Sequence, residues 1–234
     1  MGRVILSGAS KGMTVPIPYK ANFADNTWAT IIDACHKNKV PATWAVGNRK
    51  TMLIDGTEYQ IDIIGKNHDD YADGSGKAPL TFQLHDCYGE LKAMNSTNTN
   101  VGGWESCAMR TTHLPAILAL MPTEVQNGIR EVNKLTSAGG QSATINTTAD
   151  KLFLLSEIEI FGSVTYSKSG EGIQYTYYKT GGSKVKNFDG SAYPWWERSP
   201  YHGDTMHFCD VYTTGVATNY GAGGEHGVSF GFCF

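Results

Sequence analysis

The chain has 234 residues, which is enough for one large domain or two small ones with a sizeable core. Hydrophobic residues make up 41% and charged residues 18%, as in ordinary globular proteins, so the composition excludes a largely disordered chain. The formal net charge is −3, and Lys and Arg are scattered. This excludes a dominant nucleic-acid role, because phosphate binding needs a concentrated basic surface. No apolar run approaches the ~18 residues of a membrane span, so membrane insertion is not expected.

Residues 1–22 are predicted to form an extended arm or linker that docks on a neighbouring protein, and residues 23–234 a single folded domain. The arm carries short apolar patches at Val4–Leu6 and Val15–Ile17, separated by Gly, Ser, Lys and Pro. The first patch is too short for the apolar region of a signal peptide. We therefore expect the chain to be made and folded inside a cell.

Three segments have helical periodicity. Trp28, Ile31, Ile32 and Cys35 are spaced to share one helix face, which predicts a helix over residues 28–38 that begins at an Asn26 or Thr27 cap. A second helical stretch is expected over residues 104–120, with Pro115 in a first turn. The third is expected to start at Pro122 and continue through Leu135, with its apolar residues facing the core.

Alternation and turn residues predict the strands. Residues 43–64 contain Gly47-Asn48 and Asp55-Gly56 turn signals and predict two or three antiparallel strands. Further strands are expected over residues 80–87 and 228–234, the last with one buried face. Residues 136–148 are compatible with an exposed loop or a bent hairpin. The apolar segment 150–161 fits a strand followed by a short turn of helix, although its length does not distinguish strand from helix. The predicted fold class is α+β, in one compact domain.

The five cysteines argue against a disulfide framework and a structural zinc site, because their number is odd and their spacing wide. We expect most of them to be small buried hydrophobic side chains.

The C-terminal region, residues 193–234, is rich in aromatic residues, Gly and short polar residues, which favours a loop-rich recognition surface on a folded base. Aromatic rings stack on sugars and on peptide side chains, while Asn, Asp and His orient a ligand by hydrogen bonds. The alternative is an irregular β edge in which the tryptophans are buried. The candidate ligand-binding residues are Trp196, Tyr201, His202, Asp204, His207, Tyr212, Asn219 and Tyr220.

Four pieces of sequence occur in a set order: the helix from Trp28, the predicted strand pair in residues 43–69, DKLFLLSEIEIFG, and WWERSP with the closing GVSFGFC. Together, over residues 26–234, they resemble a family of uncharacterised domains in phage tail-associated proteins and in surface proteins of gut Firmicutes. That family carries a W-x-R-S-P signature. Its layout is similar to the C-type-lectin-like fold of phage tropism determinants and formylglycine-generating enzymes. Ser229-Phe230 stand here where the family has Arg-Pro.

The resemblance implies display and adhesion. The expected function is that of a non-enzymatic protein of a phage or phage-like virion, at a tail tip or fibre, that binds a host-cell surface protein or glycan through the C-terminal region. The arm would tether it to other virion proteins, and a trimer is favoured. It would be assembled in the host cytoplasm and located in the virion. The alternatives are a structural decoration or head-fibre protein, and an enzyme of the formylglycine-generating type. The enzyme uses a pair of cysteines near its C-terminus. Cys209 and Cys233 are too far apart in the sequence to match that pair.

Three residues are expected to be structural: Trp195, Arg198 and Glu157. A buried Arg198 would join carboxylate and backbone groups beneath the display surface. Glu157 either pairs with Arg198 or forms a carboxylate pair with Glu159.

No cofactor is expected. Asp69, Asp70 and Asp73 lie too irregularly for an EF-hand, because a carboxylate is missing at position 12 of that pattern. A looser calcium site or a solvated loop remain as interpretations.

Overall fold

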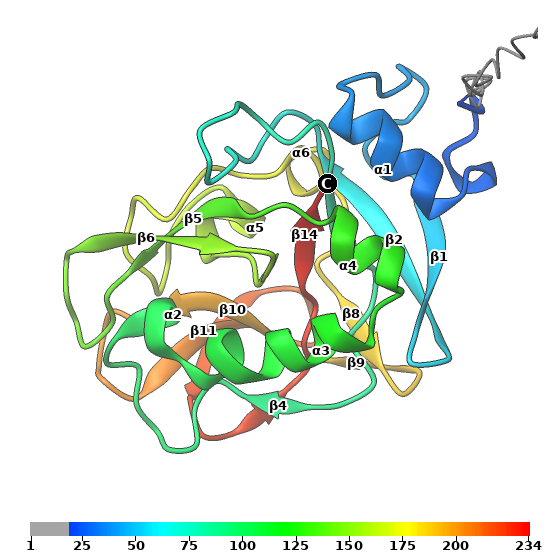
Figure 1. Ribbon diagram of the computed structural model, residues 1–234. Coiled ribbons are helices and arrows are strands. Elements are labelled where there is room, and N and C mark those ends of the chain that lie inside the picture. Colours follow the sequence, from blue (N-terminus) through cyan, green and yellow to red (C-terminus); the bar gives the residue numbers. More distant parts are fainter. Residues whose placement is uncertain (1–18) are drawn as a thin grey trace, which may run out of the picture.

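The computed structural model describes residues 19–234, so residues 1–18 of the predicted arm lie outside the described residues (Figure 1). From Tyr19 onwards the chain packs against the folded domain. The Tyr19 hydroxyl donates to Asp33 Oδ2 at 2.8 Å, and Trp44 Nε1 donates to the Lys20 carbonyl at 3.0 Å. Among the described residues, no helix has the length and apolar character needed to cross a membrane.

The helical segments are short. They are η1 (Phe23–Asp25), α1 (Trp28–His36), α2 (Gly103–Ser106), the π-helical η2 (Met109–His113), α3 (Leu114–Leu120), α4 (Thr123–Gly128), α5 (Glu157–Phe161) and α6 (Thr176–Lys179).

The strands form several small antiparallel sheets. They are β1 (Arg49–Ile54), β2 (Thr57–Gly65), β3 (Thr81–Leu84), β4 (Lys92–Ala93), β5 (Val132–Ser137), β6 (Ile145–Asp150), β7 (Leu152–Phe153), β8 (Lys186–Phe188), β9 (Ser191–Tyr193), β10 (Trp195–Pro200), β11 (His207–Val211), β12 (Ala217–Gly221), β13 (Glu225–His226) and β14 (Gly231–Cys233). The protein is therefore a single compact α+β fold, as predicted.

The largest sheet has five strands in the order β1-β2-β3-β14-β7. A three-stranded sheet, β10-β11-β12, is joined to it through the segment after β13, where Trp195 forms a bridge with Gly227. Figure 1 shows β14 near the middle of the molecule, with α1 and α4 on the side of β1 and β2, and with β10 and β11 in the lower half beside α2. The pairs β13-β4, β5-β6 and β8-β9 complete the sheets.

Aromatic packing around Phe82 joins the N-terminal helix to the end of the chain. Phe82 on β3 contacts Trp28 of α1, with ring centroids 6.0 Å apart, and Phe232 of β14, at 5.2 Å. Phe23 and Phe234 complete this cluster. The last segment was expected to have one buried face, but residues 228–234 are all buried because β14 lies between β3 and β7.

The first two helical predictions are confirmed. Helix α1 begins after Thr27, whose side chain caps it, and residues 103–120 form α2, η2 and α3, with Pro115 in the first turn of α3. The hairpin interpretation of residues 136–148 is correct, and residues 150–161 form β7 followed by α5. Helix α5 begins at a capping box made by Ser156 and Glu159.

The third helical prediction is wrong beyond Gly128. Residues 132–137 form β5, which pairs along its whole length with β6. Val132, Lys134 and Thr136 are buried in alternation with exposed neighbours, which is the period of a strand. Val125, Ile129 and Val132 are all buried, so a helix-like spacing arose from a helix and a strand that contribute to the same core.

Candidate ligand-binding groove

A polar groove lies where the β11–β12 hairpin meets the loop that follows β4. Its volume is about 560 Å³. Five side chains line it: Ser96, Thr97, Asn98, His207 and Tyr220. Gly221, Gly223 and Gly224 supply its remaining wall. Two of the predicted ligand-binding residues, His207 and Tyr220, therefore line a common groove.

Asn100 joins the two walls of the groove. Its Nδ2 lies 3.0 Å from the carbonyl oxygens of both Tyr201 and Asp204 and 2.8 Å from that of His207. Its Oδ1 accepts the N–H of Gly140 at 2.8 Å, and its own N–H donates to the Thr205 carbonyl. Asn100 is fully buried. One side chain thus fixes the 201–207 segment to the loop over residues 96–100.

A stack of three rings runs from the core to the groove. Trp196 is fully buried, His226 lies against it with ring centroids 4.7 Å apart, and Tyr220 stacks on His226 at 4.4 Å and 19°. Tyr220 remains 49% exposed. Trp196 was predicted as a ligand contact, and the structure corrects this: it lies beneath His226 and donates from Nε1 to the Lys92 carbonyl at 2.7 Å. Trp196 therefore supports the His226–Tyr220 stack from below.

Asp204 orients His207. His207 Nδ1 lies 2.6 Å from Asp204 Oδ2, and Asp204 Oδ1 accepts the backbone N–H groups of Met206 and His207. Burial would raise the pKa of Asp204, but these hydrogen bonds outweigh it and lower the pKa. With Nδ1 engaged, Nε2 is the ring nitrogen of His207 that remains for a ligand.

The remaining predicted residues are not among the described residues that line the groove. Tyr201 contacts the His207 ring edge-on at 6.2 Å, and the neighbouring His202 donates its backbone N–H to the Tyr166 carbonyl. Tyr212 lies at the turn end of the β11–β12 hairpin, away from the His207 end. Asn219 pairs with Cys209 in the middle of the hairpin and does not line the groove among the described residues.

Arg198 of the WWERSP segment is fully buried and binds four parts of the chain. It donates to both carboxylate oxygens of Glu159 and to the carbonyls of Leu135, Leu154 and Glu171. The acidic partner is Glu159, not Glu157 as one interpretation had it. Glu157 instead accepts the backbone N–H groups of residues 165–167. Trp195 is buried and donates to the Lys184 carbonyl.

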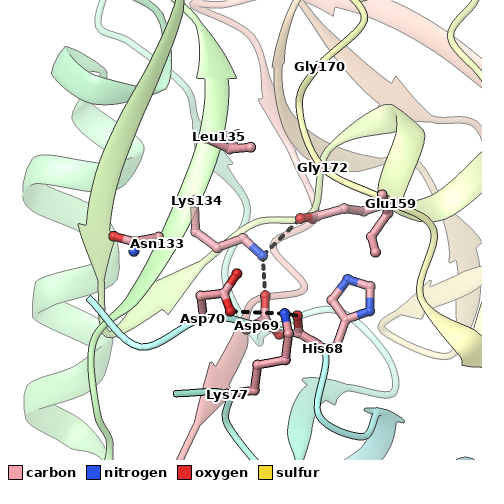
Figure 2. Close-up of a pocket in the computed structure, with 11 residues that line it drawn as sticks. His68, Asp69, Asp70, Lys77, Asn133, Lys134, Leu135, Glu159, Gly170 and Gly172 are labelled. Atoms are coloured by element: carbon pink, nitrogen blue, oxygen red, sulfur yellow. Dashed lines mark hydrogen bonds and ion pairs between the residues drawn. The ribbon is translucent and has the colours of Figure 1, made fainter. Parts of the chain in front are cut away.

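A second pocket of about 270 Å³ has an ionic floor (Figure 2). Lys134 Nζ lies 2.7 Å from Asp69 Oδ1 and 2.8 Å from Glu159 Oε1, and all three side chains are almost fully buried. Burial alone would raise the pKa of Asp69, but the charges of Lys134 and His68 and the hydrogen bonds from Lys134 and Thr81 together outweigh it and lower the pKa to about 2. With Arg198 on the other side of Glu159, two cations balance two carboxylates. This pocket is therefore read as a structural network that offers no unpaired charge among its described lining residues.

The three aspartates considered for calcium are used by three different cations. Asp69 binds Lys134, Asp70 lies 2.9 Å from Lys77 at the mouth of the second pocket, and Asp73 lies 2.6 Å from Arg130 Nη2. Within residues 19–234, no group of three or more His, Cys, Asp or Glu side chains is arranged around a possible metal position. These aspartates do not form a shared ligand set.

All five cysteines are buried free thiols, as expected of small hydrophobic side chains. Burial raises the pKa of Cys35, Cys87 and Cys107 to about 12, and that of Cys209 and Cys233 well above its ordinary value. A thiol must ionise to act as a nucleophile.

Sequence reasoning missed Asn98, Asn100 and His226. The first two belong to the loop NSTNTNVGG, which reads only as a polar turn, and their partners lie more than a hundred residues away. His226 is in the aromatic region, but its role depends on stacking between Trp196 and Tyr220. A long-range pairing of this kind has no local sequence signal.

Comparison with known proteins places the chain in a family. A model described as a domain of unknown function, DUF6273, matches residues 78–230. The match covers more than half of the chain and includes β3 to β13, with both walls of the groove. No curated protein and no solved structure matches the chain. The chain therefore belongs to the DUF6273 family.

Proposed function

We propose that the chain is a non-enzymatic binding domain of a phage or phage-like virion, which attaches to a host-cell surface through the groove between residues 96–98 and the β11–β12 hairpin. The observation that carries the proposal is the half-exposed Tyr220 ring at this groove, fixed from below by His226 and Trp196. A rigid aromatic side chain gives a large contact area at a low entropic cost.

The groove also has the size and composition of a recognition site. Its volume of about 560 Å³ is within the range of small-molecule sites. Its walls are held by Asn100 and by the Asn98 contact with Gly223, at 2.8 Å. Preorganised walls lower the entropic cost of binding. The C-type-lectin-like layout, the virion location, the trimer and tethering through residues 1–22 belong to the same proposal and rest on the W-x-R-S-P resemblance.

The test is binding of the purified protein to a panel of Firmicutes cells. Tyr220→Ala is the test variant, and Tyr212→Ala is its matched control because Tyr212 has the same residue type and the same 49% exposure at the opposite end of the hairpin. The expected result is saturable binding that is lost with Tyr220→Ala and retained with Tyr212→Ala. Equal binding by both variants would contradict the role of the groove.

The structural alternative predicts another outcome of the same experiment. A decoration or head-fibre protein would bind none of the cells and would join particles only when it is present during their assembly. Incorporation that depends on Tyr220, without cell binding, would assign the groove to contacts within the particle.

A further inference from the structure

The groove has a polar lining. Among the described residues that line it, none is Lys, Arg, Asp or Glu. Asp204, the acidic residue next to it, is engaged by His207 and by two backbone N–H groups. Phosphate and carboxylate groups are bound in proteins mainly through Arg or Lys. The lining therefore disfavours an anionic ligand.

Several polar groups of the lining have no protein partner among the described residues. Asn98 uses Oδ1 to accept the Gly223 N–H, and this leaves its Nδ2 donor without an acceptor. The hydroxyls of Ser96 and Thr97 and the Nε2 of His207 also make no hydrogen bond to described residues. Hydroxyl and amide groups and an imidazole nitrogen thus lie on both walls, and they match a ligand with several adjacent hydroxyl groups.

An aromatic ring and small residues lie next to these polar groups. The Tyr220 ring is held in one orientation by its stack on His226. A Cβ at Gly224 would lie 2.2 Å from Cε1 of Tyr220, so this position admits only glycine while the ring keeps its place. The ring is apolar on its faces and stacks on the C–H surface of a pyranose.

We infer that the groove binds a neutral saccharide unit. The inference rests on the proposed function and names its ligand class. The Tyr220 ring stacks on the apolar face of the sugar, while Asn98, Thr97, Ser96 and His207 bind its hydroxyls. A charged sugar such as a uronic or sialic acid finds no Lys or Arg among the described residues of this lining.

The inference is tested by NMR on the ¹⁵N-labelled protein, titrated with glucose, galactose, mannose, rhamnose and N-acetylglucosamine, and in parallel with glucuronate and N-acetylneuraminate. The backbone amides of Gly221, Gly223 and Gly224 report on the groove. At least one neutral sugar is expected to shift these amides saturably, and Tyr220→Ala to weaken that binding about tenfold. Tyr212→Ala should leave it unchanged.

Two results would overturn the inference: no shift of these amides by any neutral sugar at concentrations approaching molar, or larger shifts with the acidic sugars. A separate measurement keeps this failure distinct from failure of the proposed function. Cells are treated with periodate or with protease before the binding assay. Tyr220-dependent binding that survives periodate and is lost on protease treatment would retain cell attachment and reject a saccharide as the ligand.

Discussion

Arg198 and Glu159 form a bidentate ion pair in the core: Nη1 lies 2.5 Å from Oε2, and Nη2 lies 2.8 Å from Oε1. Arg198 is on β10 and Glu159 on α5, so the pair fixes a short helix to the sheet that carries the groove. The guanidinium also donates to carbonyls of three further segments. Both residues are buried, which makes the pair sensitive to loss of one partner.

Replacing Arg198 by Met should therefore destabilise the fold strongly. The change leaves Lys134 as the sole cation paired with the Glu159 carboxylate, and it removes the donors to three carbonyls. We expect the free energy of unfolding to fall by about 3–5 kcal/mol. Urea denaturation measures the change. Lys37→Met is the control, because Lys37 pairs with Asp33 on the exposed face of α1, and no measurable loss is expected there. Similar midpoints for the two variants would contradict the structural role of Arg198.

The Asp69–Lys134–Glu159 network should make stability depend on acid. The pKa of Asp69 in the folded protein is about 2, below its ordinary value of 3.8. Its contribution is present above about pH 4 and is lost as the pH falls through about 2. In Lys134→Met the two carboxylates lose their common cation. That variant should be weakened at neutral pH and should gain more stability on mild acidification than the wild type does. Thermal unfolding across this range measures the difference.

Glu197 lies next to Arg198 in sequence but has no partner. It is fully buried, and neither carboxylate oxygen accepts a hydrogen bond from the described residues. Burial, with the nearby carboxylates of Glu157 and Asp210, raises the pKa of Glu197 well above its ordinary value of 4.5. Folding therefore favours the protonated form of Glu197 relative to the unfolded chain.

Glu197→Gln should consequently be more stable than the wild type at neutral pH. A group whose pKa is raised by folding contributes stability below its unfolded pKa and loses it as the pH rises. The advantage of Gln, about 1–3 kcal/mol, should fade as the pH falls below about 4.5. Urea denaturation at several pH values measures it, with Glu225→Gln as an exposed control. An equal advantage at all pH values would show that ionisation is not its cause.

Asn100→Ala should loosen the groove. The variant leaves the carbonyls of Tyr201, Asp204 and His207 without their shared donor, and the loss of buried hydrogen bonds should cost about 1–3 kcal/mol. The amide signals of Gly223 and Gly224 should broaden or shift, and cell binding should weaken in a protein that remains folded. Asn146→Ala removes only an exposed contact with Glu105 and serves as the control. Unchanged groove signals would contradict the joining role of Asn100.

Local sequence patterns predicted most helices and strands but not the tertiary contacts between them. The spacing of Trp28, Ile31 and Cys35 gave α1 correctly, because one face of that helix packs on a single core. The spacing of Val125, Ile129 and Val132 wrongly predicted one continuous helix, because the chain changes from helix to strand there while these residues remain buried. Pairing of β5 with β6 decides that segment, and such pairing lies outside the window of a periodicity argument.

The same holds for the site. The aromatic composition of residues 193–234 pointed to His207 and Tyr220, which line the groove. It also pointed to Trp196, since composition does not separate a ring that supports from a ring that is exposed. Asn98 and Asn100 come from a loop that precedes this region by about a hundred residues, and only the fold brings them to it.

The hydrogen bonds of Asn100 fix the base of the groove. The side chains at its rim take no part in these bonds and can be replaced. The base joins the 96–100 loop to the 201–207 segment through a buried amide, while the side chains of Ser96 and Thr97 stand on the rim outside that network. A library that randomises rim positions and keeps Asn100, Gly140 and the ring stack would vary the chemistry of the groove without unfolding its frame. The protein thus offers a small scaffold in which new binding specificities can be selected by varying a few surface residues.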